Sequence, residues 1–293
     1  MAGFSLDTEP TGVKEEPTKV SSPTSEFNLE EIKKYWLEGS DIKPKLITLL
    51  YGADGTAKSF LAAENLTDED IKAGMRMVVI DLDGGFANLL PVYYKERCES
   101  LGRKVEDVFL VKNPITLNNE GDIDYKETFT EIKKAIYLVK SLHKEMNIKV
   151  IVLDGLTTLL LYAENLMRIE KSLTVDGGVS IAFWKRRNKY FLDIIEQIKS
   201  LTTSSILIGH ENFILKELED NSSVIIKTSA LCHQKIKMVR VVDKLKNTVT
   251  FKATVDKSKN NIRAEGSVYN VLSLDKTTGE YVKSTKDLFK DLV

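Results

Sequence analysis

Short apolar runs recur along the middle of the chain, separated by stretches with helical periodicity. The runs are residues 46–52, 75–83, 105–111, 149–155 and 204–210. Each run is nearly continuous in apolar side chains, which is typical of strands that helices cover on both faces. The alternation therefore predicts an α/β fold with a mostly parallel central sheet flanked by helices.

The pattern changes after about residue 224. Segments 224–228, 235–243, 248–256 and 268–274 alternate apolar with polar side chains, and residues 277–281 (TTGEY) predict a turn. Such alternation is typical of antiparallel strands with one solvated face. We therefore expect antiparallel strands to be added to the sheet towards the C-terminus.

The two ends of the chain differ from this central part. Residues 1–27 are rich in Pro, Ser, Thr, Glu and Lys and hold few large hydrophobic side chains, which predicts a disordered tail. Residues 28–44 predict a short N-terminal amphipathic helix and a polar linker. Residues 45–275 then form one α/β domain, followed by a C-terminal segment over 276–293.

Composition narrows the class of protein. The net charge is -1, so any nucleic-acid site must be a local basic patch. No apolar run is long enough to cross a bilayer, and the first residues lack a secretory signal, so we expect a cytoplasmic protein without a membrane role. Cys98 and Cys232 are far apart and only three histidines are present, which indicates neither a disulfide framework nor a zinc site.

A phosphate-binding loop follows the first predicted strand. Its residues are Gly52, Ala53, Asp54, Gly55, Thr56, Ala57, Lys58, Ser59 and Phe60. Between a strand and a helix, the backbone N–H groups of such a loop bind phosphate oxygens, Lys58 reaches the β- and γ-phosphates of ATP, and Ser59 ligates Mg²⁺. Ala57 is the one departure from G-x-x-x-x-G-K-[ST], and the GTAKS ending resembles that of MCM helicases and MoxR ATPases. An ordinary glycine-rich loop is the alternative interpretation.

Asp154 ends the apolar run KVIVLD and is the expected partner of this loop. A carboxylate at that strand end binds Mg²⁺ through its waters or accepts a hydrogen bond from Ser59. The alternative is that Asp154 only caps the following helix. The strand continues as Asp-Gly and lacks the Asp-Glu pair of the MCM motors, so an MCM-type motor is disfavoured.

Two further strand ends carry polar side chains. The segment VVIDLDGGF resembles the RecA and RadA segment whose acid orients the attacking water, and Asp83 takes that place, with Asp81 as a competitor. The run SSILIGH ends in His210, where RecA-like ATPases keep a polar residue that senses the γ-phosphate. The alternatives are a loop-capping pair of aspartates and an ordinary polar strand end.

Lys257 and Lys259 follow in the order of the same superfamily. They resemble the Lys-x-Arg or Lys-x-Lys pair that ring helicases and KaiC-like proteins insert into the ATP site of the neighbouring subunit, where the cations stabilise developing charge. The resemblance implies a homo-oligomer. A solvated hairpin is the alternative.

Candidate DNA-binding residues lie between the strands that end at Asp154 and His210. They are Lys185, Arg186, Arg187 and Lys189, which stand among Trp184 and Tyr190. Cations mixed with aromatic rings suit single-stranded DNA, and the position matches the first DNA loop of RecA. The alternative is a helix that packs its aromatic rings inward and turns its cations outward.

Two other segments bear on DNA. Residues 211–227 match the position of the second DNA loop of RecA but are acidic. From Lys227 to Arg263 ten Lys or Arg stand against two Asp, which forms a phosphate-facing stripe if the strands align and an ordinary solvated face if they do not.

Together these motifs resemble the RecA/RadA/KaiC-like P-loop ATPase superfamily, closest to the compact phage and archaeal RecA-like ATPases associated with single-strand annealing. The resemblance covers about Lys45 to Gly266. It implies a Mg²⁺-dependent, oligomeric ATPase that acts on single-stranded DNA in recombination or replication, with a protein partner bound through the N-terminal tail and helix. A KaiC-like regulatory ATPase acting on proteins and a non-hydrolysing nucleotide-binding module are the alternatives.

Overall fold

The computed structural model of the protein describes residues 45–174, 177–211, 230–283 and 288–291. The chain divides into two compact units, Met1–Lys43 and Pro44–Val293, and the described residues all belong to the second. The predicted tail, the predicted N-terminal helix and the predicted strand at 224–228 lie outside the described residues.

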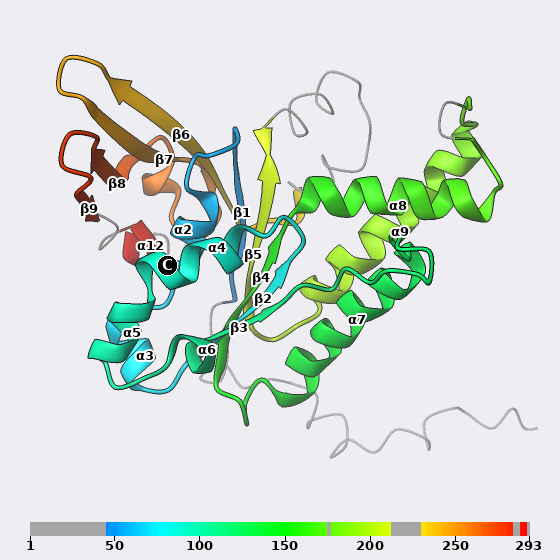
Figure 1. The fold of residues 1–293 in the computed structure, drawn as a ribbon, viewed down its shortest axis with the longest axis horizontal. Helices are drawn as coiled ribbons and strands as arrows, with labels where there is room; N and C mark the ends of the chain where they lie inside the picture. Colours follow the sequence, from blue (N-terminus) through cyan, green and yellow to red (C-terminus); the bar gives the residue numbers. More distant parts are fainter. Residues whose placement is uncertain (1–44, 175–176, 212–229, 284–287, 292–293) are drawn as a thin grey trace, which may run out of the picture. The chain divides into compact units, whose positions relative to one another are not determined.

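The described residues form a nine-stranded sheet with the order β3-β2-β4-β5-β1-β6-β7-β8-β9 (Figure 1). The strands are β1 (Ile47–Gly52), β2 (Arg76–Asp81), β3 (Phe109–Lys112), β4 (Ile148–Asp154), β5 (Ser204–His210), β6 (Gln234–Asp243), β7 (Thr248–Ser258), β8 (Val268–Asp275) and β9 (Tyr281–Lys283). The pairs from β3 to β6 are parallel, and those from β6 to β9 are antiparallel. The predicted fold class is confirmed.

Helices cover both faces of the parallel part of the sheet (Figure 1). They are α2 (Lys58–Ala63), α3 (Asp68–Lys72), α4 (Gly85–Tyr93), α5 (Lys95–Ser100), α6 (Val105–Val108), α7 (Tyr125–Leu142), α8 (Leu156–Glu170) and α9 (Ile181–Lys199), with the 3-10 turn η3 (Ile262–Ala264) and α12 (Leu288–Asp291) near the C-terminus. The first group, α2 to α6, packs on one face and α7 to α9 on the other, each with its own buried apolar cluster. Each fully buried Leu or Ile contributes about 1.5–3 kcal/mol to stability, so both faces anchor the sheet.

Two predicted strands are shorter in the structure. Residues 105–108 form the helical turn α6 instead of a strand, because Glu106 and Asp107 in its first turn favour a helix N-terminus. The second strand ends at Asp81, whose side chain turns to accept hydrogen bonds from the first backbone N–H groups of α4. Asp83 therefore lies just beyond the sheet.

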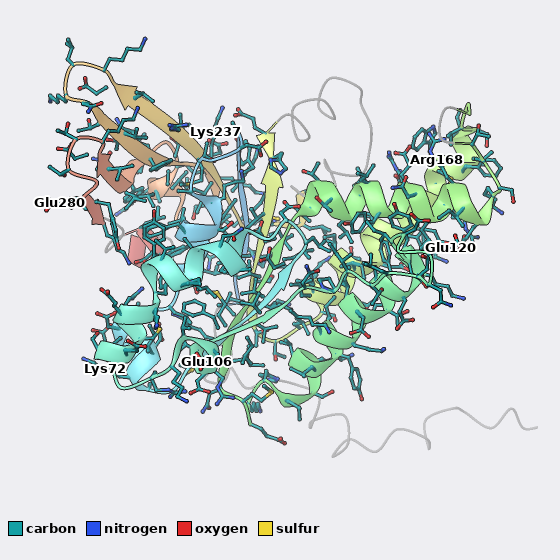
Figure 2. The ribbon with its side chains drawn as sticks, in the orientation of Figure 1. Lys72, Glu106, Glu120, Arg168, Lys237 and Glu280 are labelled. Carbon is teal, nitrogen blue, oxygen red and sulfur yellow. The ribbon has the colours of Figure 1, made fainter. Side chains whose placement is uncertain are left out.

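The C-terminal part extends the sheet past the expected turn. The turn forms at Lys276–Thr278, at the start of the predicted 277–281, and the hydrogen bond from Gly279 N–H to Asp275 O closes it. Tyr281 then begins β9, which pairs with β8 from Leu274↔Tyr281 to Leu272↔Lys283. Exposed charged side chains, among them Glu280, surround the described core (Figure 2).

Sheet order brings the polar strand ends together. The central strands β2, β4, β5 and β1 are adjacent and parallel, so their carboxyl ends share one edge. The register pairs Asp81 with Asp154 and Gly52 with His210. Ligands of open α/β sheets bind outside this edge, so the candidate functional site lies there.

Candidate functional site

The phosphate-binding loop leaves β1 at Gly52 and enters α2 at Lys58. A Cβ on Gly52 would lie 2.3 Å from Met238 O of the neighbouring β6, so only glycine allows this close approach of the two strands. Inside the loop, the Thr56 hydroxyl donates to Ala53 O at 2.7 Å. This side-chain to backbone hydrogen bond closes the loop before the helix starts.

Ala57 adopts the left-handed conformation, with φ 62° and ψ 33°. This is the one position at which the loop departs from the usual glycine. An L-residue pays about 1–2 kcal/mol in this conformation. The fold therefore imposes this backbone geometry on a residue for which it is unfavourable.

Lys58 lies over the loop and is largely buried. Its Nζ donates to Gly52 O at 3.1 Å and to Ala53 O at 2.8 Å. Burial lowers the pKa of Lys58, while the nearby carboxylates of Asp54, Asp154 and Asp83 oppose that shift. The ammonium is thus held against the backbone of the loop that the sequence predicts to bind phosphate.

Ser59 and Asp154 meet directly, as the sequence analysis expects. The Ser59 hydroxyl donates to Asp154 Oδ2 at 2.6 Å. A Cβ on Gly85 would lie 2.8 Å from Ser59 Oγ and 2.9 Å from Asp154 Oδ2, so glycine keeps the space beside the two oxygens open. Mg²⁺ prefers oxygen ligands of these two kinds, and the residues present fit a magnesium ion.

Three carboxylates gather at this edge of the sheet. Burial raises the pKa of Asp154 to about 7 against the opposing hydrogen bond from Ser59, and the charges of Asp81 and Asp83 raise it further. A buried group of like charges is costly unless a cation joins it. Among the described residues, no group of three or more His, Cys, Asp or Glu side chains could hold a metal ion, so a magnesium site here rests on Ser59 and Asp154.

The two aspartates of the VVIDLDGGF segment have separate environments. Asp81 is 1% exposed, and its carboxylate accepts the backbone N–H groups of Gly85, Phe86 and Ala87 at 3.0–3.2 Å, which caps α4. Asp83 accepts the Thr158 hydroxyl at 2.5 Å and keeps 28% of its side chain exposed. Only Asp83 remains open to the site.

His210 lies between the loop and Asp83. Its Nδ1 is 2.5 Å from Asp54 Oδ1, and its Nε2 is 3.6 Å from Asp83 Oδ2. Its backbone N–H donates to Thr157 Oγ1 at 3.3 Å, which ties the end of β5 to the start of α8. The imidazole thus connects a phosphate-binding loop residue with the expected general base.

An apolar pocket of about 320 Å³ opens directly beside residues 55–60 of the loop. Its other walls are Gly85, Leu89, Tyr93, Phe251, Leu272, Leu274 and Tyr281. None of these wall residues stands out in the sequence, because their local patterns are those of ordinary core and strand positions. Phe60, expected to contact the nucleotide, is 2% exposed and packs edge-on against Tyr93 with ring centroids 5.6 Å apart.

Lys257 and Lys259 lie away from this site. Lys257 on β7 is the register partner of Lys235 on β6. Gln234, the residue before Lys235, is the register partner of Thr48 near the start of β1. The loop begins four positions further along β1, about 13 Å away at 3.3 Å per residue. The two lysines stand at the opposite edge of the sheet from the loop of their own chain.

The candidate DNA-binding residues lie on α9 and differ in their partners. Arg186 donates to Glu170 Oε2 at 2.7 Å and to Tyr190 at 2.9 Å. Arg187 donates to Asn188 and lies over the ring of Trp184, 4.4 Å from its centroid. The side chains of Lys185 and Lys189, one helical turn apart, are exposed.

Comparisons with known proteins give structural neighbours only. No model of a known protein family matches the chain, and no curated protein matches it. Among solved structures, the chain is similar to a KaiC-like protein from the hyperthermophilic archaeon Pyrococcus horikoshii OT3, with 15% identity, a TM-score of 0.44, and 79% of this chain and 88% of that chain covered. It is also similar to the RadB recombinase, with 17% identity, a TM-score of 0.41, and 78% and 88% covered. Among the described residues, no helix is long and apolar enough to span a membrane.

Proposed function

We propose that the protein binds and hydrolyses ATP with Mg²⁺. One observation carries the proposal: Lys58, Ser59, Asp154 and Asp83, which stand on three separate segments of the sequence, converge at one edge of the sheet. A lysine, a hydroxyl and carboxylates around a loop of backbone N–H groups are the parts that phosphoryl transfer requires. The apolar pocket beside the loop adds a place for the nucleoside.

Each residue has a defined role in the proposed reaction. Bound beside Ser59 and Asp154, Mg²⁺ would supply neutralising positive charge to the phosphate oxygens. Lys58 leaves the carbonyl oxygens of its own loop and binds the β- and γ-phosphates. Asp83, oriented by Thr158, accepts a proton from the water that attacks the γ-phosphorus, and ADP leaves with the displaced oxygen. His210 couples the occupied loop to Asp83.

We further propose that the protein acts on single-stranded DNA in recombination or replication, as an oligomer. Lys185 and Lys189 on α9 are exposed like Arg186, but unlike Arg186 they form no ion pair with another described residue, so they are open to a phosphate backbone. Lys257 and Lys259, remote from the loop of their own chain, are suited to reach the site of a neighbouring copy. A cation supplied in this way stabilises the charge of phosphoryl transfer.

A regulatory ATPase that acts on protein partners is the second candidate. It is favoured by the contacts of Arg186 and Arg187, since both guanidinium groups are engaged within the chain. A nucleotide-binding module without turnover is the third, because Ala57 strains the loop and Asp83 is shorter than a glutamate. The three candidates differ in hydrolysis and in its response to DNA.

The test is ATP turnover by the purified protein with and without single-stranded DNA, with Lys58→Ala as the control for contaminating activity. We expect turnover that needs Mg²⁺ and Lys58 and rises several-fold with DNA. An ATP turnover rate that is the same with and without single-stranded DNA supports the regulatory ATPase. Bound ATP that persists unhydrolysed contradicts the ATPase proposal and supports the binding module.

A further inference from the structure

The short strand β9 forms one wall of the pocket beside the phosphate-binding loop. Tyr281, the first residue of β9, lines the pocket together with Tyr93 of α4. Their rings meet edge to face with centroids 5.0 Å apart, and Tyr93 in turn packs against Phe60. Phe60 stands two residues after Lys58, so a chain of aromatic rings connects the loop helix to the last strand of the sheet.

Backbone pairing alone holds β9 weakly. The strand has three residues and pairs with β8 on one side. Three ladder positions at a sheet edge contribute little, because a short edge strand frays easily. A side-chain contact is needed to keep Tyr281 against the pocket.

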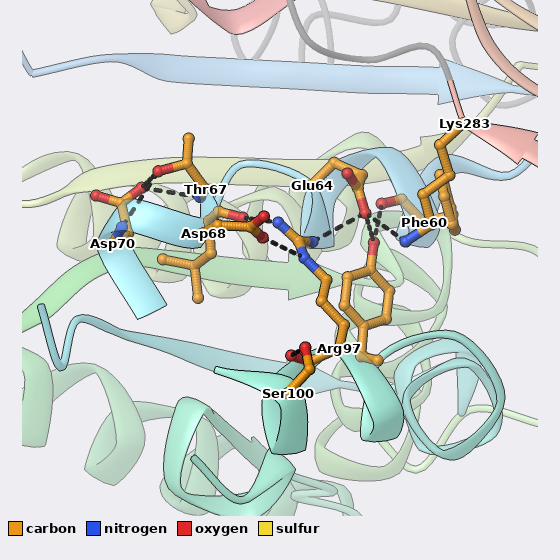
Figure 3. Close-up of polar contacts among 10 residues, drawn as sticks. Phe60, Glu64, Thr67, Asp68, Asp70, Arg97, Ser100 and Lys283 are labelled. Carbon is orange, nitrogen blue, oxygen red and sulfur yellow. Dashed lines mark hydrogen bonds and ion pairs between the residues drawn. The ribbon is translucent and has the colours of Figure 1, made fainter. Parts of the chain in front are cut away.

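Lys283 supplies that contact. Its Nζ is 3.2 Å from Glu64 Oε1, and it lies over the rings of Phe60 and Tyr94, 5.2 Å and 4.8 Å from their centroids. Figure 3 shows Lys283 and Arg97 approaching the Glu64 carboxylate, which stands at the end of α2. An ammonium between a carboxylate and two aromatic faces gains from both interactions.

Glu64 is a buried anchor for this lysine. Its side chain is 8% exposed, and Arg97 Nη1 also binds it at 3.1 Å, while the Tyr94 hydroxyl donates to it. Burial raises the pKa of Tyr94 well above its usual value, and the neighbouring Glu64 carboxylate adds to that shift, so the phenol stays a donor. Arg97 is itself fixed by Asp68 at 2.8 Å. The carboxylate is therefore rigidly placed, and α2 joins β9 through it.

We propose that Tyr281 contacts the nucleoside of the bound nucleotide and that the Lys283–Glu64 pair is the positioning pair that holds it there. The proposal rests on the proposed nucleotide binding. A triphosphate in the loop directs the nucleoside to the adjoining pocket, whose volume lies within the roughly 300–1,000 Å³ of small-molecule sites. The pocket walls are apolar and aromatic, which suits stacking or edge contact with a base.

The experiment compares two probes: a fluorescent ATP analogue labelled on the ribose, and inorganic tripolyphosphate, which has no nucleoside and is measured by calorimetry. Tyr281→Ala is expected to weaken the labelled ATP about tenfold, the loss typical of one aromatic contact with a base. Lys283→Met is expected to weaken it about threefold to fivefold, since the pair is partly exposed. Neither variant changes the affinity for tripolyphosphate.

Conservative and matched variants separate this role from general damage. Tyr281→Phe keeps the ring and Lys283→Arg keeps the charge, so both are expected to bind labelled ATP like the wild type. Lys276→Met, in the exposed turn before β9, is the control and leaves both probes unaffected.

Unchanged affinity for labelled ATP in both Tyr281→Ala and Lys283→Met overturns the proposal. Equal weakening of tripolyphosphate also overturns it, because β9 then acts on the loop and not on the nucleoside. If the wild type binds neither probe, and Lys58→Ala behaves identically, the proposed function fails and the role of Tyr281 fails with it.

Discussion

At the residue scale, Ala57 combines an ordinary side chain with an unusual backbone. Its φ of 62° is favourable for glycine and unfavourable for alanine. We expect Ala57→Gly to raise the free energy of unfolding by up to about 1 kcal/mol, because relief of left-handed strain exceeds the added entropy of the unfolded chain. Denaturant unfolding measures the change.

Ala73→Gly is the matched control for this substitution. Ala73 is exposed and right-handed, with φ −72°, so glycine there relieves no strain. Its free energy of unfolding should fall by about 0.5 kcal/mol. If both glycine variants lose stability equally, Ala57 is not strained in the folded protein.

His233 is a second residue whose surroundings have a measurable consequence. Its Nδ1 accepts the backbone N–H of Ile47 at 3.0 Å, which requires an unprotonated nitrogen. Burial lowers the pKa of His233 below 6.5, and the charges of Lys259, Lys45 and Lys257 lower it further. The neutral imidazole thus stabilises the first residue of β1 through this hydrogen bond.

This lowered pKa predicts that acid destabilises the protein. As the pH falls below 6.5, the unfolded chain binds a proton that the folded chain resists, so the free energy of unfolding falls. His233→Asn keeps a hydrogen-bond acceptor but does not titrate. The free energy of unfolding of this variant should therefore fall less than that of the wild type as the pH is lowered. Melting temperatures at pH 7.5 and pH 5.5 provide the measurement, and a variant that declines as steeply as the wild type contradicts the assignment.

At the scale of elements, α9 separates two kinds of cation that the sequence presents together. Arg186 is exposed but tied to Glu170 at the end of α8, and Arg187 is tied to Trp184 within α9, whereas Lys185 and Lys189 are exposed and form no ion pair with another described residue. If α9 binds single-stranded DNA, the lysines must account for most of the phosphate contact. Figure 1 shows α8 and α9 extending away from the sheet side by side.

The double variant Lys185→Gln/Lys189→Gln is expected to bind a labelled oligothymidine several-fold more weakly. The slope of log affinity against log salt should fall in magnitude by about 1.4, since two phosphate contacts are lost from a single strand. Fluorescence anisotropy at several salt concentrations gives both quantities. The melting temperature should stay unchanged because both side chains are exposed.

Arg187→Gln is the companion variant on the same helix. Loss of its contacts with Asn188 and the Trp184 ring should lower the free energy of unfolding by about 1 kcal/mol. Its effect on oligothymidine affinity should be smaller than that of the lysine pair. The DNA assignment of α9 is wrong if the lysine variant binds as tightly as the wild type.

At the scale of the whole molecule, the two ends of the sheet carry complementary charges. The carboxyl edge holds Asp54, Asp83 and Asp154, while the amino edge holds Lys257 and Lys259. Burial lowers the pKa of Lys257, and the like charge of Lys259 lowers it further. Head-to-tail association would bring one edge to the other.

Mixing two inactive proteins tests this arrangement. Lys58→Ala lacks a working loop but keeps both lysines, and Lys257→Ala/Lys259→Ala has the opposite defect. In randomly mixed oligomers about one quarter of the sites join an intact loop to an intact lysine pair, so about a quarter of wild-type turnover should return. A mixture as inactive as its components contradicts action between subunits.

Much of the site follows from local sequence. The order Gly52 to Ser59 after an apolar run specifies a strand, a tight loop and a helix, since backbone conformation there depends on glycine and on neighbouring residues. Asp154 and His210 end apolar runs, and ends of neighbouring parallel strands must share an edge. These relations need only periodicity and topology, which is why the sequence predicts them.

Other assignments depend on contacts that have no local pattern. Asp81 and Asp83 look equivalent in sequence, and the start of α4 decides between them by taking Asp81 as its cap. Lys283 reaches Glu64 across 219 residues, and Tyr281 joins the pocket beside the loop because β9 is added to the sheet edge. By itself the sequence determined the α/β order and the strand, loop and helix around Gly52 to Ser59, because both depend on neighbouring residues. Tertiary structure alone decided which carboxylate stays open and which aromatic ring completes the pocket, because strand register and helix packing set those distances.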